Sequence, residues 1–194
     1  MNKPNPENRK DEIIKTAAGL FKKKGYSAVT MRDIAQTMGI KAASLYNHIQ
    51  SKQDILNSIV ISIAQEFTKG METIKATNSG NLEKLHQIVL LHVDITAKNT
   101  YQMASLNNDW MHLESQLDYY LQLRNAYEKD VMDIIKAGIE SNEFIDANPE
   151  IIMFSILSTL RSLYLWIPKK EELDTNELAH NLSKVLIQGI SRKN

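Results

Sequence analysis

Apolar side chains recur every three or four residues along most of the chain, which is the spacing of one face of an α-helix. No run alternates apolar and polar residues as a half-buried strand does. Residues that break helices are scarce, because the 194 residues include only seven glycines and four prolines. The sequence therefore predicts an all-α fold with short polar or glycine-containing breaks between helices.

These breaks divide the chain into nine expected helices. Two starts, Thr30 with Asp33 and Ser51 with Asp54, have the spacing of a capping box with Asp in place of Glu. A third start, Asn148-Pro149-Glu150, has a cap residue, a proline at the first helical position and an acid in the first turn. The nine expected helices cover about 7–24, 30–38, 40–49, 51–75, 81–98, 101–112, 115–141, 148–167 and 175–191.

Positive charge is concentrated near the amino end, although the net charge of the whole chain is zero. Residues 1–54 contain ten Lys and Arg against five Asp and Glu, so 10 − 5 = +5. The remainder contains 13 against 18, so 13 − 18 = −5. A basic segment favours contact with a polyanion such as nucleic acid, and a chance scatter of surface charge is the alternative.

Two short helices about a turn at Gly39 lie within this basic segment and are typical of a helix-turn-helix. In that unit the first helix braces the second, which enters the major groove of DNA. Leu45 and Ile49 are four residues apart and should face inward. Because such helix pairs are common in all-helical proteins, the DNA interpretation depends on a cluster of hydrogen-bond donors. The cluster comprises Thr30, Arg32, Lys41, Ser44, Tyr46, His48 and Lys52.

The stretch TMRDIAQTMGIKAASLYNHIQSKQDIL resembles the DNA-binding signature of TetR-type (TetR/AcrR) transcriptional regulators over about residues 10–57. The shared motifs are T-x-R-x-I-A, the Gly-Ile turn, L-Y-x-H and the S-K pair. The resemblance implies a nine-helix architecture with a DNA-binding domain at 1–54 and a ligand-binding and dimerisation domain at 55–194. It also implies that Arg32 reaches a base and that five residues contact phosphates, namely Thr30, Ser44, Tyr46, His48 and Lys52.

The tip of the second helix departs from the usual pattern, because Ala42 and Ala43 stand where the family often has polar or bulky residues. Alanine can contact a thymine methyl group but cannot hydrogen-bond a base. Direct reading of the bases should then fall to Arg32 and Lys41, together with the shape of the DNA. As alternatives to DNA contact, Tyr46 could pack its ring under the segment, His48 could be an ordinary surface residue and Arg32 could pair with Asp33 or with another helix.

The expected helix at 148–167 is apolar all round, which predicts burial on every side. In a helical body of this size, one side of such a helix would normally stay exposed to solvent. A second chain that covers that side is the simplest explanation, and a monomer with a fully buried central helix is the alternative. The resemblance implies a four-helix homodimer interface formed by 148–167 and 175–191 of both subunits. A two-fold dimer would space two recognition helices along a palindromic operator.

Aromatic and sulfur-containing residues gather between these segments, and core packing is their default role. The stretches LRNAYEKDVMDIIKAGIESNEF and LYLWIPKKEELDTNELAHNLSKVLIQGI resemble TetR-type regulators of fatty-acid and acyl-coenzyme A metabolism, with Asn142 and Lys170 where glycine is frequent. The resemblance implies an effector with an apolar acyl tail and an anionic head held by Arg124 or Arg161. A salt bridge from Arg124 to Glu128 is the alternative. The candidate effector-binding residues are His92, Met103, Trp110, Tyr120, Arg124, Tyr127, Phe154, Arg161 and Trp166.

The expected function is a dimeric DNA-binding repressor that responds to a small hydrophobic effector, either a fatty acyl-CoA or an apolar drug or other lipophilic molecule. An enzyme is not expected, because the chain lacks the usual nucleophile, zinc and phosphate-loop motifs. A metal site formed by His92, Asp109 and His112 is a weak alternative, because the chain has no cysteine and no close pair of histidines. No cofactor is expected.

The apolar run at 151–160 is too short to span a bilayer, so we expect no membrane and a cytoplasmic location. A helical adaptor that does not bind DNA is the second class of function.

Overall fold

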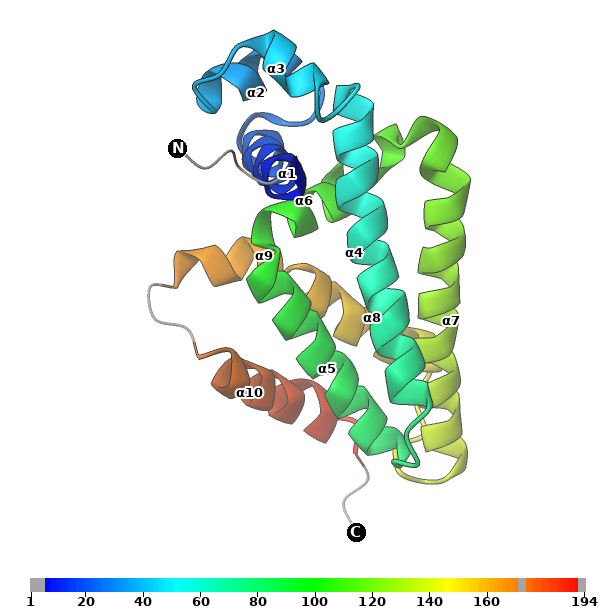
Figure 1. Cartoon of the computed structure of the whole chain (residues 1–194). Helices are drawn as coiled ribbons and strands as arrows, with labels where there is room; N and C mark the ends of the chain where they lie inside the picture. Colours follow the sequence, from blue (N-terminus) through cyan, green and yellow to red (C-terminus); the bar gives the residue numbers. More distant parts are fainter. Residues whose placement is uncertain (1–5, 171–173, 192–194) are drawn as a thin grey trace. The chain divides into compact units, whose positions relative to one another are not determined.

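The computed structural model describes residues 6–170 and 174–191, and within them the chain is helical with ten α-helical segments (Figure 1). A single bridge between Phe144 and Ser191 is the only β-type pairing in this described part. The predicted all-α fold is confirmed. The contacts between residues divide the chain into two compact units, Met1–Ala64 with Tyr101–Tyr120 and Gln65–Thr100 with Leu121–Asn194.

The first unit contains the amino-terminal helices and the segment around residue 110. Its complete helical elements are α1 (Pro6–Lys24), α2 (Met31–Thr37), α3 (Ala42–Tyr46) and the 3₁₀ turns η1 (Trp110–His112) and η2 (Glu114–Gln116). The first part of α4 (Lys52–Lys75) and nearly all of α6 (Thr100–Asn108) also belong to it. The stripe of α1 that carries Ile13, Ala17 and Phe21 is buried, as are Ile34 of α2 and Leu45 of α3. These side chains form the core on which the helix-turn-helix rests.

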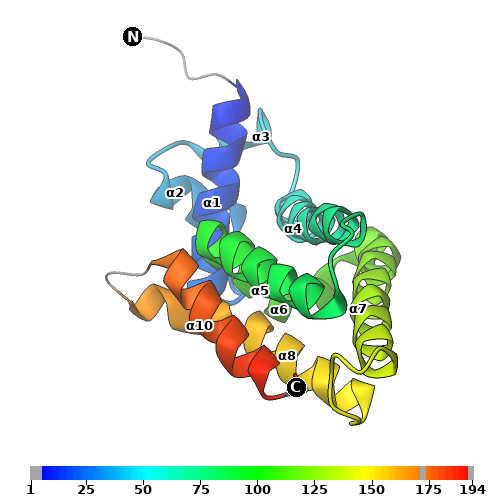
Figure 2. The same ribbon diagram turned by 90° about the horizontal axis from the view of Figure 1, so that it is seen from below.

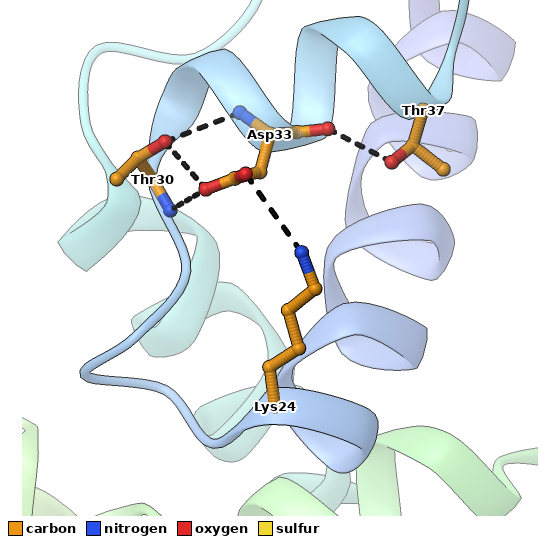
Figure 3. A network of polar contacts seen from close by, with 4 residues as sticks. All are labelled: Lys24, Thr30, Asp33 and Thr37. Carbon is orange, nitrogen blue, oxygen red and sulfur yellow. Dashed lines mark hydrogen bonds and ion pairs between the residues drawn. The ribbon is translucent and has the colours of Figure 1, made fainter.

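The start of α2 is held by the capping box that the sequence predicted (Figure 3). The Asp33 N–H donates to Thr30 Oγ1 at 3.2 Å, and the Thr30 N–H donates to Asp33 Oδ2 at 2.8 Å. The Thr30 hydroxyl also donates to Asp33 Oδ2 at 2.6 Å. Hydrogen bonds from the Thr30 side chain and backbone therefore lower the pKa of Asp33. The start of α4 is capped similarly, since the Asp54 N–H donates to Ser51 Oγ at 3.0 Å.

The second unit contains the rest of α4, most of α7 (Leu117–Glu140) and the whole of the following elements. These are α5 (Asn81–Lys98), α8 (Pro149–Arg161), α9 (Leu163–Trp166), the 3₁₀ turn η3 (Ile167–Lys169) and α10 (Thr175–Gln188). Helices α5 and α10 lie side by side in both views (Figures 1 and 2). Helix α10 buries Ala179, Ser183 and Ile187 on one face. Between α7 and α8, Asn142 has a φ of 61°, a left-handed conformation that asparagine tolerates better than most residues.

Several expected helices end earlier or are interrupted in the structure; α6 ends at Asn108 and not at 112, and α10 at Gln188 and not at 191. Helix α3 ends at Tyr46 and not near residue 49, because the backbone tightens there and the His48 N–H bonds to the Leu45 carbonyl at 2.9 Å. The helix expected at 148–167 is interrupted at Ser162, whose hydroxyl donates to the Thr159 carbonyl at 2.8 Å. Counting α8 and α9 as one interrupted helix brings the described segments to the nine that the sequence predicts.

Apolar residues of α8, α9 and α10 are divided between a buried and an exposed side. The predicted all-round burial is wrong for the chain by itself, since Ile152, Ile156 and Leu160 are buried whereas Phe154 is 71% exposed. The interval Pro149–Lys169 is apolar and long enough to cross a membrane by length and composition alone, which a count of the run at 151–160 did not reveal. The core helix of a soluble protein can meet the same criteria, and this interval is broken at Ser162 and contains Arg161.

Two helical glycines predict opposite effects of the same substitution. A Cβ at Gly138 would lie 2.1 Å from Cε2 of the buried Phe144, whereas a Cβ at Gly19 would meet nothing within 4 Å. Gly138→Ala should lower the free energy of unfolding by about 1–3 kcal/mol despite its better helix propensity. Gly19→Ala should raise that free energy by up to about 1 kcal/mol. Urea unfolding of both variants measures the difference, and equal effects would contradict the close packing of Phe144 on Gly138.

Candidate DNA-binding and effector sites

Helix α3 carries a buried anchor and an exposed outer face. Leu45 and Ile49 are buried, as their spacing predicted. Lys41, which precedes the helix as its N-cap, is exposed, and so are Ala43 and Ser44. Ala42 and His48 are half-buried. The outer face of α3 therefore presents a small apolar tip between a cation and a hydroxyl group.

Arg32 projects from α2 as an exposed cation. The alternative in which it pairs with Asp33 is wrong in this structure, because Asp33 bonds to Thr30 and lies 3.8 Å from the Lys24 ammonium group (Figure 3). Among the described residues, neither Arg32 nor Lys41 forms a salt bridge. Both side chains are therefore available to an external polyanion.

Tyr46 is 54% exposed, so its ring does not pack under the helix-turn-helix as the alternative supposed. A tyrosine in this position presents both its ring and its hydroxyl to whatever lies against α3. Thr30 is exposed as well, but its hydroxyl is already committed to Asp33. Of these two candidates, Tyr46 has the more accessible hydroxyl.

The side chain of Lys52 has internal partners, which the sequence did not indicate. Its ammonium group donates to the Tyr26 carbonyl at 2.8 Å and lies 4.2 Å from the centre of the Tyr26 ring. A phosphate contact through this ammonium group would compete with both contacts. The backbone N–H groups at the amino end of α4 remain a second means of binding an anion there.

A polar cluster around Tyr26 connects three parts of the first unit, and sequence reasoning missed it. The Tyr26 hydroxyl donates to Gln53 Oε1 at 2.7 Å, and Gln53 Nε2 donates to the His112 carbonyl at 2.6 Å. The Tyr26 and His112 rings stack with their centres 5.3 Å apart. Burial raises the pKa of Tyr26, and the nearby Glu114 and Asp109 add to the effect. No motif could have revealed these contacts, because Gln53 and His112 are 59 residues apart.

A buried group in the second unit joins α4, α5 and α7. His92 is 3% exposed, and its Nε2 lies 2.9 Å from the Tyr127 hydroxyl. The Phe67 ring packs against His92 with centres 4.6 Å apart and against Tyr127 at 5.6 Å. Burial, aided by the charge of Arg161, lowers the pKa of His92 to about 3. Burial also raises the pKa of Tyr127. Both groups are therefore uncharged at neutral pH.

The two candidate arginines share one carboxylate. Arg124 Nε donates to Glu128 Oε1 at 3.0 Å, which confirms the i,i+4 salt bridge that we considered as an alternative. Arg161 Nη2 donates to the same oxygen at 2.6 Å. The pKa of Glu128 is lowered, because the bonds from Arg161 and Arg124 outweigh the opposing effect of burial. Neither arginine is an uncommitted partner for an anionic ligand.

The other candidates are distributed between the two units. Met103 and Tyr120 are buried in the first unit, where the half-buried Trp110 lies 5.8 Å from the Tyr120 ring. Phe154 and Trp166 belong to the second unit but are exposed, and Trp166 has the Lys170 ammonium group 4.8 Å from its ring centre. These two therefore do not line the interior of their unit, contrary to our expectation.

The proposed metal ligands are also separated, with Asp109 and His112 in the first unit and His92 in the second. The described residues contain no group of three His, Cys, Asp or Glu side chains spaced to hold a metal ion.

A short exposed helix with free donors, braced by two helices in a basic segment, defines the class of helix-turn-helix DNA-binding proteins. Comparison with known families gives the same class. Residues 13–59 match the family described as bacterial regulatory proteins, tetR family, and residues 78–190 match the tetracyclin repressor-like C-terminal domain. The chain belongs to the TetR family. It is thus a DNA-binding transcriptional regulator and not an enzyme.

Similar proteins include two kinds of repressor. The transcriptional repressor KstR2 of Mycolicibacterium smegmatis is 24% identical over 191 residues, which cover 96% of this chain and 93% of that protein. The biofilm operon negative regulator IcaR of Staphylococcus aureus strain Newman is 49% identical over 157 residues, covering 80% and 82% of the two chains. The solved structure of the ketosteroid regulator KstR2 of Mycobacterium tuberculosis has a TM-score of 0.88 at 22% identity, covering 95% and 96%.

The buried His92 predicts a loss of stability in mild acid. Its pKa is about 3 in the folded chain and near 6.5 when unfolded, so the unfolded state binds more protons between these values. The contribution of the neutral His92 to the free energy of unfolding is fully present above about pH 6.5. The free energy of unfolding should be lower by about 2 kcal/mol at pH 5. The two titratable groups that act on His92 are Tyr127 on α7 and Arg161 on α8.

Urea unfolding at pH 7 and pH 5 measures this effect in the wild type and in His92→Phe. The variant should lack the His92 part of the pH dependence whatever its absolute stability, because phenylalanine does not titrate. His86→Gln, on the same helix, is the matched control and should keep that part. An unchanged slope in His92→Phe would show that His92 does not remain neutral in the folded chain.

Proposed function

We propose that the chain is a homodimeric repressor that binds a palindromic operator and is regulated by a small hydrophobic effector. The observation that carries the DNA-binding part is the pair of exposed cations, Arg32 and Lys41, which have no salt-bridge partner among the described residues and flank the outer face of α3. Residues 1–54 would form the DNA-binding domain, and residues 55–194 would bind the effector and the second subunit. A regulator of this kind works in the cytoplasm, where the bacterial chromosome lies.

In the proposed complex, the helix-turn-helix supplies two kinds of contact. Arg32 and Lys41 read base edges, because a cationic donor can bond guanine in the major groove. Ala42 and Ala43 meet thymine methyl groups at most, so DNA shape contributes to the selection of the operator. The proposed phosphate contacts come from Thr30, Ser44, Tyr46, His48 and Lys52.

The proposed dimer interface uses the exposed apolar side of α8, α9 and α10. This surface, here called the apolar stripe, comprises Ile151, Phe154, Leu165, Trp166 and Val185. Val185 is 74% exposed, and large exposed apolar side chains are typical of a protein interface. A second copy of the chain covers the stripe in this proposal, which completes the burial that the sequence of 148–167 predicts.

The proposed effector site lies in the second unit, and the candidates that are buried or half-buried there are His92, Arg124, Tyr127 and Arg161. The buried contacts that join His92, Tyr127 and Phe67 support His92 and Tyr127 as members of this site. A fatty acyl-CoA is the proposed effector, and one solved structure of similar fold is titled a fatty acid degradation regulator. Another lipophilic molecule, such as an apolar drug, is the second candidate. The effector acts by favouring one of two conformations, which requires unequal affinity for them.

Arg32→Ala should weaken binding to a duplex from the chain's own promoter region by about 5- to 150-fold, because it removes a proposed base contact worth about 1–3 kcal/mol. Fluorescence anisotropy at increasing salt is the measurement, and wild-type affinity should fall steeply with salt as phosphate contacts are screened. Lys98→Ala is the matched control, because Lys98 lies on α5 and pairs with Asp94. Absent binding at low salt, or affinity that ignores salt, would favour the helical adaptor.

Val185→Glu should convert the dimer to monomer, because it places an unpaired carboxylate in the proposed apolar interface. Native mass spectrometry and sedimentation report the mass of one chain or two. His180→Glu is the control on the same helix, since His180 is exposed and lies away from Val185 around α10. Dimers in both variants would place the interface elsewhere.

A further inference from the structure

Two buried polar atoms on α5 have no hydrogen-bond partner among the described residues. They are Nδ1 of His92 and Oγ1 of Thr96. Both side chains are buried, and their separation by four residues places them on one face of the helix. Buried polar atoms are almost always bonded in native proteins, so a pair of exceptions on one helix face requires an explanation.

The surroundings of His92 determine which of its atoms is free. Nε2 bonds to the Tyr127 hydroxyl at 2.9 Å, and the Phe67 ring packs against the imidazole. Tyr127 is thus a positioning residue that orients the imidazole, leaving Nδ1 as the ring nitrogen without a partner. The low pKa of His92 supports a neutral imidazole, so Nδ1 offers one donor or one acceptor depending on the tautomer.

The charges nearby disfavour an anionic ligand group at this point. Arg161 and Arg124 both bond to Glu128 Oε1, at 2.6 and 3.0 Å. A carboxylate beside His92 would lose its hydration and gain only neutral partners, unless it displaced Glu128 from an arginine. An uncharged oxygen bears a much smaller desolvation cost and satisfies both free atoms.

We propose that the effector carries an uncharged hydroxyl or carbonyl oxygen that hydrogen-bonds to His92 Nδ1 and Thr96 Oγ1, with apolar carbon against Phe67. A hydroxyl fits either tautomer of His92, because it both donates and accepts. A ketone or thioester carbonyl accepts from the Thr96 hydroxyl and from Nδ1–H. This inference rests on the proposed function, and it names the chemical group that the effector site recognises.

Three ten-carbon probes test the inference: 1-decanol, 2-decanone and decanoate. Calorimetry should show that the alcohol or the ketone binds at least about tenfold more tightly than the carboxylate, the ratio that corresponds to about 1.4 kcal/mol. In ¹⁵N NMR spectra of histidine-labelled protein, the better probe should shift the Nδ1 resonance of His92 more than Nε2. Tighter binding of decanoate, or no shift of His92 with either neutral probe, would overturn the inference.

Thr96→Val separates recognition from folding, because valine keeps the shape of threonine without its hydroxyl. The variant should unfold at a higher temperature, since it removes an unpaired buried hydroxyl, yet bind the better neutral probe about three- to tenfold more weakly. Ser183→Ala is the matched control, because its buried hydroxyl on α10 also has no partner among the described residues. This control should leave probe affinity unchanged, and equal affinity in wild type and Thr96→Val contradicts the inference.

DNA binding by the probe-free protein keeps the two proposals distinguishable. If that binding is absent, the proposed regulator function fails whatever the probes do. If it is present and His92 does not respond to either neutral probe, only the inference about the effector's oxygen fails.

Discussion

The proposed DNA-binding surface on α3 depends on the packing of Leu45 and Ile49 into the first unit. Helix α3 has five residues, and an isolated helix of that length is not stable in water. Its orientation must therefore come from tertiary packing and from the helix that braces it. The capping box of Thr30 and Asp33 fixes the start of that bracing helix. Because packing of Leu45 and Ile49 positions this short helix, its tip can carry alanines.

The same capping box influences the charge of the proposed DNA-binding surface. Asp33 is the acid nearest to Arg32 in the sequence, and it could have neutralised that arginine. In the structure the Asp33 carboxylate accepts a hydrogen bond from Thr30 and lies 3.8 Å from the Lys24 ammonium group, so the positive charge of Arg32 remains exposed. Lys52 shows the opposite outcome, since its ammonium group is held by the carbonyl and ring of Tyr26. Arg32 and Lys41 are thus exposed cations without a salt bridge among the described residues, whereas the Lys52 ammonium group has internal partners.

Local features of the structure could be predicted from the sequence, because their causes lie within one helical turn. The spacing of Thr30 and Asp33 predicted a cap, the spacing of Arg124 and Glu128 allowed an ion pair, and Leu45 was correctly placed inward. These contacts join residues three or four apart, where helix geometry alone brings side chains together.

Contacts between distant parts of the chain could not be predicted in this way. Arg161 and Glu128 are 33 residues apart, and His92 and Tyr127 are 35 apart. The family resemblance suggested some of these residues as ligand partners, but no pattern showed that they bond to one another. The apolar pattern of 148–167 also could not show which side of this helix packs against the rest of the chain. Phe154 was therefore expected inside but lies on the surface.

Helix α4 offers a physical route by which an effector could influence DNA binding. Its first turn holds Tyr26 through Lys52 and Gln53, and further along Phe67 packs against His92 and Tyr127. Because α4 is one continuous helix, a ligand that requires a new position for Phe67 acts on the element that holds Tyr26. Such a ligand shifts the balance of conformations only by its difference in affinity between them. Unpaired atoms at His92 and Thr96 would provide that difference if one conformation gives a ligand better access to them.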